Sequence, residues 1–237
     1  MSNELLLLMA TAASIGVVHT LLGPDHYVPF IVLAKARGWS LARTAGITVL
    51  CGLGHVLSSV VLGMAGIALG LAVHRLEAVE STRGEIAGWA LIALGAVYTA
   101  WGIKKAFSGG HGHVHLGSGH ASVHALTHAH EHGGKAEAEA ARRAPVTPWA
   151  LFIVFVLGPC EPLIPILMYP AAAQSAFGMV AVTVVFAATT LAAMLAVTLA
   201  GVKGLALLPV HHLERFAHAL AGAAILACGV AIKFLGL

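Results

Sequence analysis

The sequence reads Gly23-Pro24-Asp25-His26-Tyr27-Val28-Pro29 within an apolar run over residues 5–34, and Gly158-Pro159-Cys160-Glu161-Pro162-Leu163-Ile164-Pro165 within another over 147–173. A proline inside a helix removes the hydrogen bond to the carbonyl four residues back. We therefore predict that helices 1 and 4 are broken by proline and that the carbonyl oxygens of Thr20 and Phe155 are exposed.

The composition around these segments indicates a membrane protein. The 237-residue chain is 59% hydrophobic and only 10% charged, whereas soluble domains carry about 25% charge. A helix needs roughly 20 apolar residues to cross a bilayer core of about 30 Å, and continuous rather than alternating runs exclude strands. We predict an all-α, polytopic, multi-pass protein with six transmembrane helices, at about 5–34, 45–73, 86–107, 147–173, 176–201 and 216–237.

The two halves of the chain resemble each other at an offset of 134 or 135 residues. The two Gly-Pro segments match, and Ala87–Gly95 matches Ala221–Gly229. Three spans per half make the second half enter the membrane from the opposite side, which predicts an inverted repeat. The expected domains are a first three-helix repeat (1–107), a cytoplasmic histidine-rich loop (108–146) and a second three-helix repeat (147–237), with both breaks near the bilayer midplane.

Basic residues set the expected orientation. Ten Lys and Arg residues fall in the odd-numbered loops and three fall elsewhere, so both termini should lie outside and the histidine-rich loop should be cytoplasmic, in a cell inner (plasma) membrane. The N-terminus lacks a basic region before its apolar segment, so we expect that segment to be retained. The ten are Lys35, Arg37, Arg43, Lys104, Lys105, Lys135, Arg142, Arg143, Lys203 and Arg215; the three are Arg75, Arg83 and Lys233.

Polar side chains at the depth of the breaks suggest a metal site. Mixed imidazole, carboxylate and thiolate groups suit Ni²⁺, Co²⁺ or Zn²⁺, whereas Mg²⁺ and Ca²⁺ take oxygen ligands. The alternative is structural: the acidic groups cap the half-helices, the cysteine packs as a small hydrophobe and the threonines bond their own helix. Candidate ligands are His19, Asp25, His26, His55, Cys160 and Glu161, supported by Thr20, Thr189 and Thr190.

A histidine-rich segment separates the two halves. Eight of the fifteen histidines fall here, with Gly, Ser and Ala between them, a composition that does not form a packed core. Histidine is the commonest metal-binding side chain, so we expect this loop to capture metal ions; a merely polar loop is the alternative. The eight are His111, His113, His115, His120, His124, His128, His130 and His132.

The first motif, His19-Thr20-Leu21-Leu22-Gly23-Pro24-Asp25-His26, resembles that of the nickel/cobalt transporter families, namely the NiCoT permeases, the nickel–cobalt efflux proteins and the urease-accessory-like membrane proteins. Leu53-Gly54-His55 followed by Val60-Val61 is similar to their second motif. The resemblance implies Ni²⁺ or Co²⁺ as substrate, moved in or out, with no prosthetic group. Residues 158–162 are similar instead to a segment shared by membrane thiol-relay proteins and sulfite exporters.

The expected function is transmembrane transport of divalent transition-metal ions, with no enzyme activity and with release driven by ligand protonation. One alternative is an exporter of sulfite or another small oxyanion, which Asp25 and Glu161 would repel. A thiol relay would need a cysteine in each half, but Asp25 occupies the position that corresponds to Cys160. The third alternative function is a metal-sensing or metallochaperone-docking membrane subunit. Expected partners are membrane lipid, the metal ion, a cytoplasmic metallochaperone or metalloenzyme accessory protein and further copies of the chain in an oligomer, but not nucleic acid.

Overall fold

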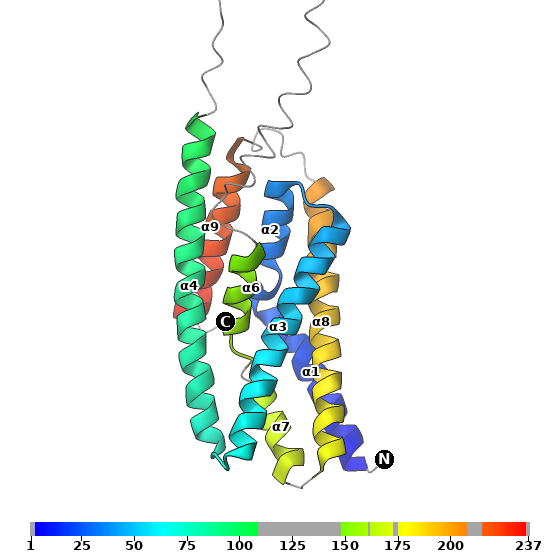
Figure 1. Ribbon diagram of the computed structural model, residues 1–237. Coiled ribbons are helices and arrows are strands. Elements are labelled where there is room, and N and C mark those ends of the chain that lie inside the picture. Colours follow the sequence, from blue (N-terminus) through cyan, green and yellow to red (C-terminus); the bar gives the residue numbers. More distant parts are fainter. Residues whose placement is uncertain (1–2, 109–147, 161, 173–174, 208–214, 236–237) are drawn as a thin grey trace, which may run out of the picture.

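The computed structural model describes residues 3–108, 148–160, 162–172, 175–207 and 215–235, and these are all-helical, with no strand. The helices form an elongated bundle (Figure 1). In chain order they are α1 (Asn3–Leu22), the 3-10 turn η1 (Pro24–His26), α2 (Val28–Arg37), α3 (Leu41–Ala68), α4 (Val73–Ser108), α6 (Pro148–Leu157), α7 (Leu163–Ala172), α8 (Ala176–Leu207), α9 (Ala217–Val230) and the π-helix η3 (Ala231–Leu235).

Five helices are long and apolar enough to cross a membrane: Asn3–Leu22, Leu41–Ala68, Val73–Phe107, Ala176–Leu207 and Ala217–Leu235. Large apolar side chains stay exposed along them, among them Leu7, Leu57, Val61 and Val180, as a lipid-facing surface requires. The chain is therefore a membrane-embedded helical protein. The fourth predicted run is not one long helix, because it is divided between α6 and α7.

The first predicted break separates α1 from α2. Gly23 takes an extended conformation (φ −88°, ψ 97°), while its N–H still donates to the His19 carbonyl at 3.0 Å. Pro24 then begins η1, at a position where a helix has no use for its missing N–H. Pro29 stands in the first turn of α2 for the same reason. The turn that follows α2 needs Gly38, whose φ of 62° is left-handed.

The second predicted break separates α6 from α7. The Gly158 N–H closes the last turn of α6 on the carbonyls of Val154 (2.9 Å) and Phe155 (3.1 Å). Pro159 follows and has no N–H with which to continue the ladder. In Figure 1 both breaks lie near the middle of the bundle's long axis, with α1 and α7 extending toward one end and α2 and α6 toward the other.

The third predicted span began too late. It was expected over 86–107, with Arg83 outside it, but α4 begins at Val73 and includes Arg83. The Arg83 guanidinium lies 2.7 Å from the carboxylate of Glu80, which is fully buried. Charges one helical turn apart neutralise each other, so a stretch that looks polar by hydropathy is accommodated inside the bundle.

Small residues bring α4 and α9 close together. A Cβ on Gly95 would collide with the backbone of Leu226, and a Cβ on Gly229 would lie 2.8 Å from the Ile92 nitrogen. Such close backbone approach at small residues is common between membrane helices. Elsewhere α1 packs on α8, and α3 packs on α6, α7 and α8. This packing places the first break opposite the middle of α3, where His55 lies.

Candidate metal centre

Three imidazoles converge at the first break: His19 from the last turn of α1, His26 from η1 and His55 from the middle of α3. One ring nitrogen from each lies within 4.8 Å of the others, and both His26 and His55 are buried. Ring centroids are 4.7 Å apart for His19 and His26 and 5.0 Å for His26 and His55. Within the described part of the chain this is the one group of metal-ligating side chains so arranged.

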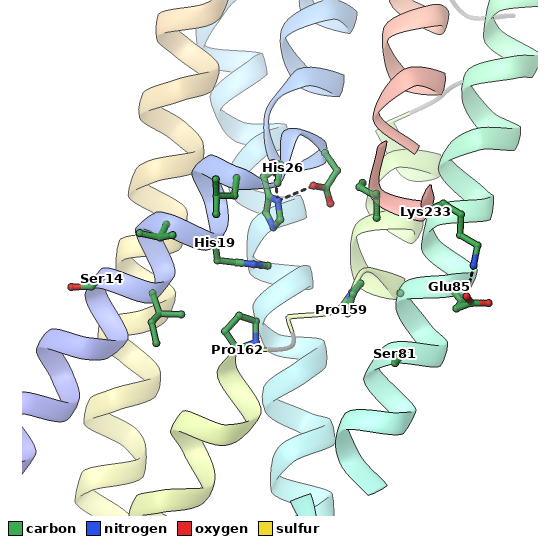
Figure 2. A pocket seen from close by; sticks show the side chains of 15 residues that line it. Ser14, His19, His26, Ser81, Glu85, Pro159, Pro162 and Lys233 are labelled. Atoms are coloured by element: carbon green, nitrogen blue, oxygen red, sulfur yellow. Dashed lines mark hydrogen bonds and ion pairs between the residues drawn. The ribbon is translucent and has the colours of Figure 1, made fainter. Parts of the chain in front are cut away.

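The chain turn at Gly23 explains why His19 and His26 meet. On an unbroken helix, residues seven apart would lie about 10 Å apart along the axis. The extended Gly23 and the η1 turn change the direction of the chain, and the His26 ring lies 4.7 Å from the His19 ring. Figure 2 shows the two rings projecting from the same segment toward α3.

The surroundings of His26 fix which of its nitrogens is free. Nδ1 lies 3.0 Å from the Asp25 carboxylate and 3.1 Å from the Gly23 carbonyl, and both are acceptors. Nδ1 must therefore carry a proton and donate it, and in the neutral ring Nε2 then keeps its lone pair. A carboxylate that holds the far nitrogen of a histidine is the usual support of a metal-binding imidazole.

His55 is oriented by the second break. Its Nδ1 lies 3.3 Å from the carbonyl oxygen of Phe155, so Nδ1 donates and Nε2 keeps its lone pair. This is the carbonyl that Pro159 was predicted to free, although Gly158 also donates to it at 3.1 Å. The broken helix thus supplies the acceptor that turns the His55 ring toward His26.

The resulting arrangement brings lone pairs face to face. The Nε2 atoms of His26 and His55 are 3.4 Å apart, and neither can donate to the other while both rings are neutral. The Nε2 atom of His19 is buried without a hydrogen-bond partner. Unpaired buried nitrogen atoms are costly, and a cation placed between them would satisfy all three.

The other predicted ligands take different positions. Asp25 lies behind His26, on its Nδ1, and outside the group of three nitrogens. Cys160 is fully buried in an apolar cluster with Val56, Leu163 and Phe186. Glu161 and the histidines of residues 111–132 lie outside the described residues, and their roles as ligands stay predictions.

The predicted supporting threonines bond within their own helices or pack between helices. Thr20 donates to the Gly16 carbonyl at 2.8 Å, and Thr189 donates to the Val185 carbonyl at 2.9 Å. Thr190 is fully buried, and its hydroxyl has no hydrogen-bond partner. Both Thr189 and Thr190 lie against Gly16, so they hold α8 close to the helix that carries His19.

Sequence reasoning missed Arg83. Its Nη2 atom donates to the Ser58 hydroxyl and to the Val156 carbonyl, both at 2.7 Å. Arg83 therefore binds freed backbone of the second break and ties it to α3, three residues beyond His55. The i, i+3 spacing of Glu80 and Arg83 was the available signal, because such a pair can enter a membrane helix together.

A cavity of about 680 Å³ lies beside the imidazoles, with walls from α1, η1, α4, the second break and η3. Figure 2 shows Glu85 and Lys233 on the side of this cavity away from His19. A smaller cavity adjoins it and is lined by His55, Phe155 and Pro159. Both breaks therefore line these two neighbouring cavities, which share Asp25 and Pro159, and the polar lining of the larger one includes Ser14 and Ser81.

Comparison with known proteins does not identify a family for this chain. No protein-family model, curated protein or solved structure matches the chain, so the resemblance to the nickel/cobalt transporter families depends on the quoted motifs alone.

Proposed function

We propose that this protein moves a divalent transition-metal ion, with Ni²⁺ or Co²⁺ as the expected substrate, across the membrane through a site formed by His19, His26 and His55. The observation that carries the proposal is the convergence of three imidazole nitrogens at the mid-height of a membrane-embedded bundle, where the His19 Nε2 atom has no hydrogen-bond partner. Intramembrane ionisable groups mark ion pathways more often than they serve packing.

The donor set supports a borderline metal. Imidazole suits Ni²⁺, Co²⁺ and Zn²⁺, whereas Mg²⁺ and Ca²⁺ prefer oxygen. A tetrahedral ion such as Zn²⁺, about 2.1 Å from each nitrogen, holds pairs of nitrogens roughly 3.4 Å apart. His26 and His55 already have that separation, 3.4 Å. The His19 ring, 4.7 Å from that of His26, would supply the third nitrogen.

The reciprocal contacts between α4 and α9 support an inverted repeat. Gly95 meets Leu226 and Gly229 meets Ile92, and each of these residues is 134 positions from its counterpart in the other pair. Contacts that repeat when the two halves are exchanged are the signature of a two-fold axis. Six crossings in two inverted halves, with the site between broken helices, is an architecture of secondary transporters.

The direction of the helix ends supports the proposed orientation. The ends of α2, α4 and α8 lie toward the same end of the bundle as the start of α9, and α6 runs from that half toward the middle (Figure 1). Most of the basic residues flank these ends, so this side would be cytoplasmic. The histidine-rich loop then joins α4 to α6 in the cytoplasm, where it would hold ions near the transport path.

The test is Ni²⁺ transport by the full chain in proteoliposomes, together with Ni²⁺ binding in detergent. His55→Ala should weaken binding at the central site at least about 100-fold and abolish transport, because a buried ligand cannot be replaced by its neighbours. His74→Ala, at the exposed start of α4, is the matched control and should behave as the wild type. Equal transport by His55→Ala and His74→Ala would refute the proposal.

The same assay separates the competing functions. A sensor or docking subunit would bind Ni²⁺ at the three histidines without moving it. An oxyanion exporter would transport sulfite and ignore Ni²⁺, but lone pairs facing inward from His26 and His55 repel an anion. We therefore favour the metal ion as substrate.

A further inference from the structure

We propose that Glu85 and Lys233 form a cation gate in the wall of the cavity. In this gate the Glu85 carboxylate is a transient binding site for the divalent ion on its way to or from the histidines. Lys233 is the tethered cation that the ion must displace. The inference depends on the proposed transport function and adds to it a second binding site and a device for selecting charge.

The two residues face the same cavity as the histidines. The Lys233 ammonium contacts the Glu85 carboxylate in a salt bridge between η3 and α4. Both side chains line the cavity that His19, Asp25 and His26 also line. Figure 2 shows the pair on the far side of this space, with Ser81 one turn below on α4. An ion in the cavity would therefore meet one carboxylate from α4 as well as the imidazoles.

The chemistry of Glu85 and Lys233 suits brief binding of a passing metal ion rather than tight binding. A single carboxylate oxygen is a weaker and more exchangeable ligand for Ni²⁺ or Co²⁺ than three imidazoles. At equal distance a divalent ion attracts this carboxylate about twice as strongly as a monovalent ion does. The lysine already supplies one positive charge, so a monovalent ion gains little by replacing it. The pair would thus pass divalent ions and hold back Na⁺ and K⁺.

Lys233 has a second partner to move to. Its ammonium lies 5.9 Å from the centre of the Trp89 ring, which is within cation–π range. Glu85 and Trp89 are four residues apart on α4 and therefore lie one above the other on the same face. When a metal ion takes the carboxylate, the lysine can rest on the indole without becoming an unpaired charge. Lys233 also lies in a π-helical segment, a feature that is rare and often found at functional sites.

The experiment measures Ni²⁺ flux into proteoliposomes and equilibrium Ni²⁺ binding for Glu85→Gln and Lys233→Met in the full chain. We expect Glu85→Gln to raise KM for Ni²⁺ by about fivefold or more, because the charge that draws the ion in is lost. Equilibrium binding at the histidines should change less than about twofold, which also shows that the variant is folded. Glu77→Gln, an exposed position on the same helix, is the matched control and should keep the wild-type KM.

Lys233→Met tests the other half of the gate. A permanently open carboxylate should accept other divalent ions, so Mg²⁺ should inhibit Ni²⁺ flux at roughly tenfold lower concentration than in the wild type. The gate is overturned if both variants match Glu77→Gln in KM and Mg²⁺ inhibition while His55→Ala is inactive; transport through the histidines would then stand alone. It is also overturned if Glu85→Gln shifts equilibrium binding as much as KM. A wild-type protein without Ni²⁺ flux would refute transport itself.

Discussion

At the scale of single residues, the hydrogen bonds of each imidazole determine which ring nitrogen can bind a further partner. Acceptors surround Nδ1 of both His26 and His55, so each ring donates outward and presents an Nε2 lone pair inward. Two such nitrogens 3.4 Å apart repel each other unless a positive charge lies between them. This geometry suits a proton shared between the two rings or a bound cation.

Asp25 holds His26 by its charge, and Asp25→Asn tests this role. The amide still accepts a hydrogen bond, but it no longer strengthens the imidazole as a donor to a metal ion. We expect Ni²⁺ affinity to fall about 10- to 100-fold, the usual cost of losing such a partner. Titration calorimetry in detergent measures the change, with Glu4→Gln as a control at the exposed start of α1. If affinity were unchanged, Asp25 would have no part in preparing the site.

At the scale of elements, side chains from two neighbouring helices form hydrogen bonds with the backbone carbonyls of the second break. Arg83 of α4 donates a hydrogen bond to the Val156 carbonyl, and Nδ1 of His55 in α3 donates one to the Phe155 carbonyl. Freed backbone is tolerated at membrane depth only where protein or a cavity satisfies it. Because the same guanidinium also contacts Ser58, the break, α3 and α4 keep a fixed relation around the site.

Replacing Arg83 should therefore loosen the bundle and the site together. Arg83→Met leaves the buried Glu80 carboxylate without its guanidinium, and breaking a buried pair costs about 3 kcal/mol or more. We expect a clearly lower unfolding temperature in detergent and weaker Ni²⁺ binding. The double variant Glu80→Gln with Arg83→Met removes both charges and should recover part of the stability. A single variant as stable as the wild type would show that the pair holds nothing in place.

At the scale of the whole molecule, α4 from the N-terminal half packs closely against α9 from the C-terminal half. The glycines that permit the contact come from equivalent positions, Gly95 and Gly229. At these positions the backbones of the two helices approach each other closely, as small residues allow between membrane helices. An inverted repeat would use such a contact to expose one site to alternate sides of the membrane.

Equivalent glycines should be equally sensitive. Gly95→Ala and Gly229→Ala each place a methyl group against the backbone of the facing helix, so each should lose about 1–3 kcal/mol of stability. Gly46→Ala is the control, because no atom of another helix lies within 4 Å of a Cβ at that position. Thermal unfolding of the three variants in detergent gives the comparison. Markedly different losses at Gly95 and Gly229 would contradict a two-fold relation between the halves.

The sequence by itself determined the features that depend on neighbouring residues along the chain, namely where helices form and where they end. Continuous apolar runs set the helical, membrane-embedded class, and the helices end at both Gly-Pro positions as predicted. His19, His26 and His55 were all identified as candidates, because imidazoles inside apolar runs need a reason to be there. Hydropathy failed where charges compensate each other, so the predicted start of the third helix at residue 86 was wrong: α4 begins at Val73 and includes Arg83, which is half-buried.

The tertiary structure alone decided which groups meet. His55 lies 29 residues after His26 along the chain, and only the packing of α3 against the first break brings their nitrogens within 3.4 Å. In the same packing Asp25 lies on the Nδ1 side of the His26 ring and Cys160 lies among apolar side chains, although both were predicted from the sequence as metal ligands. Helix formation and helix breaking depend on neighbours along the chain, whereas a coordination site depends on how distant helices are placed in space.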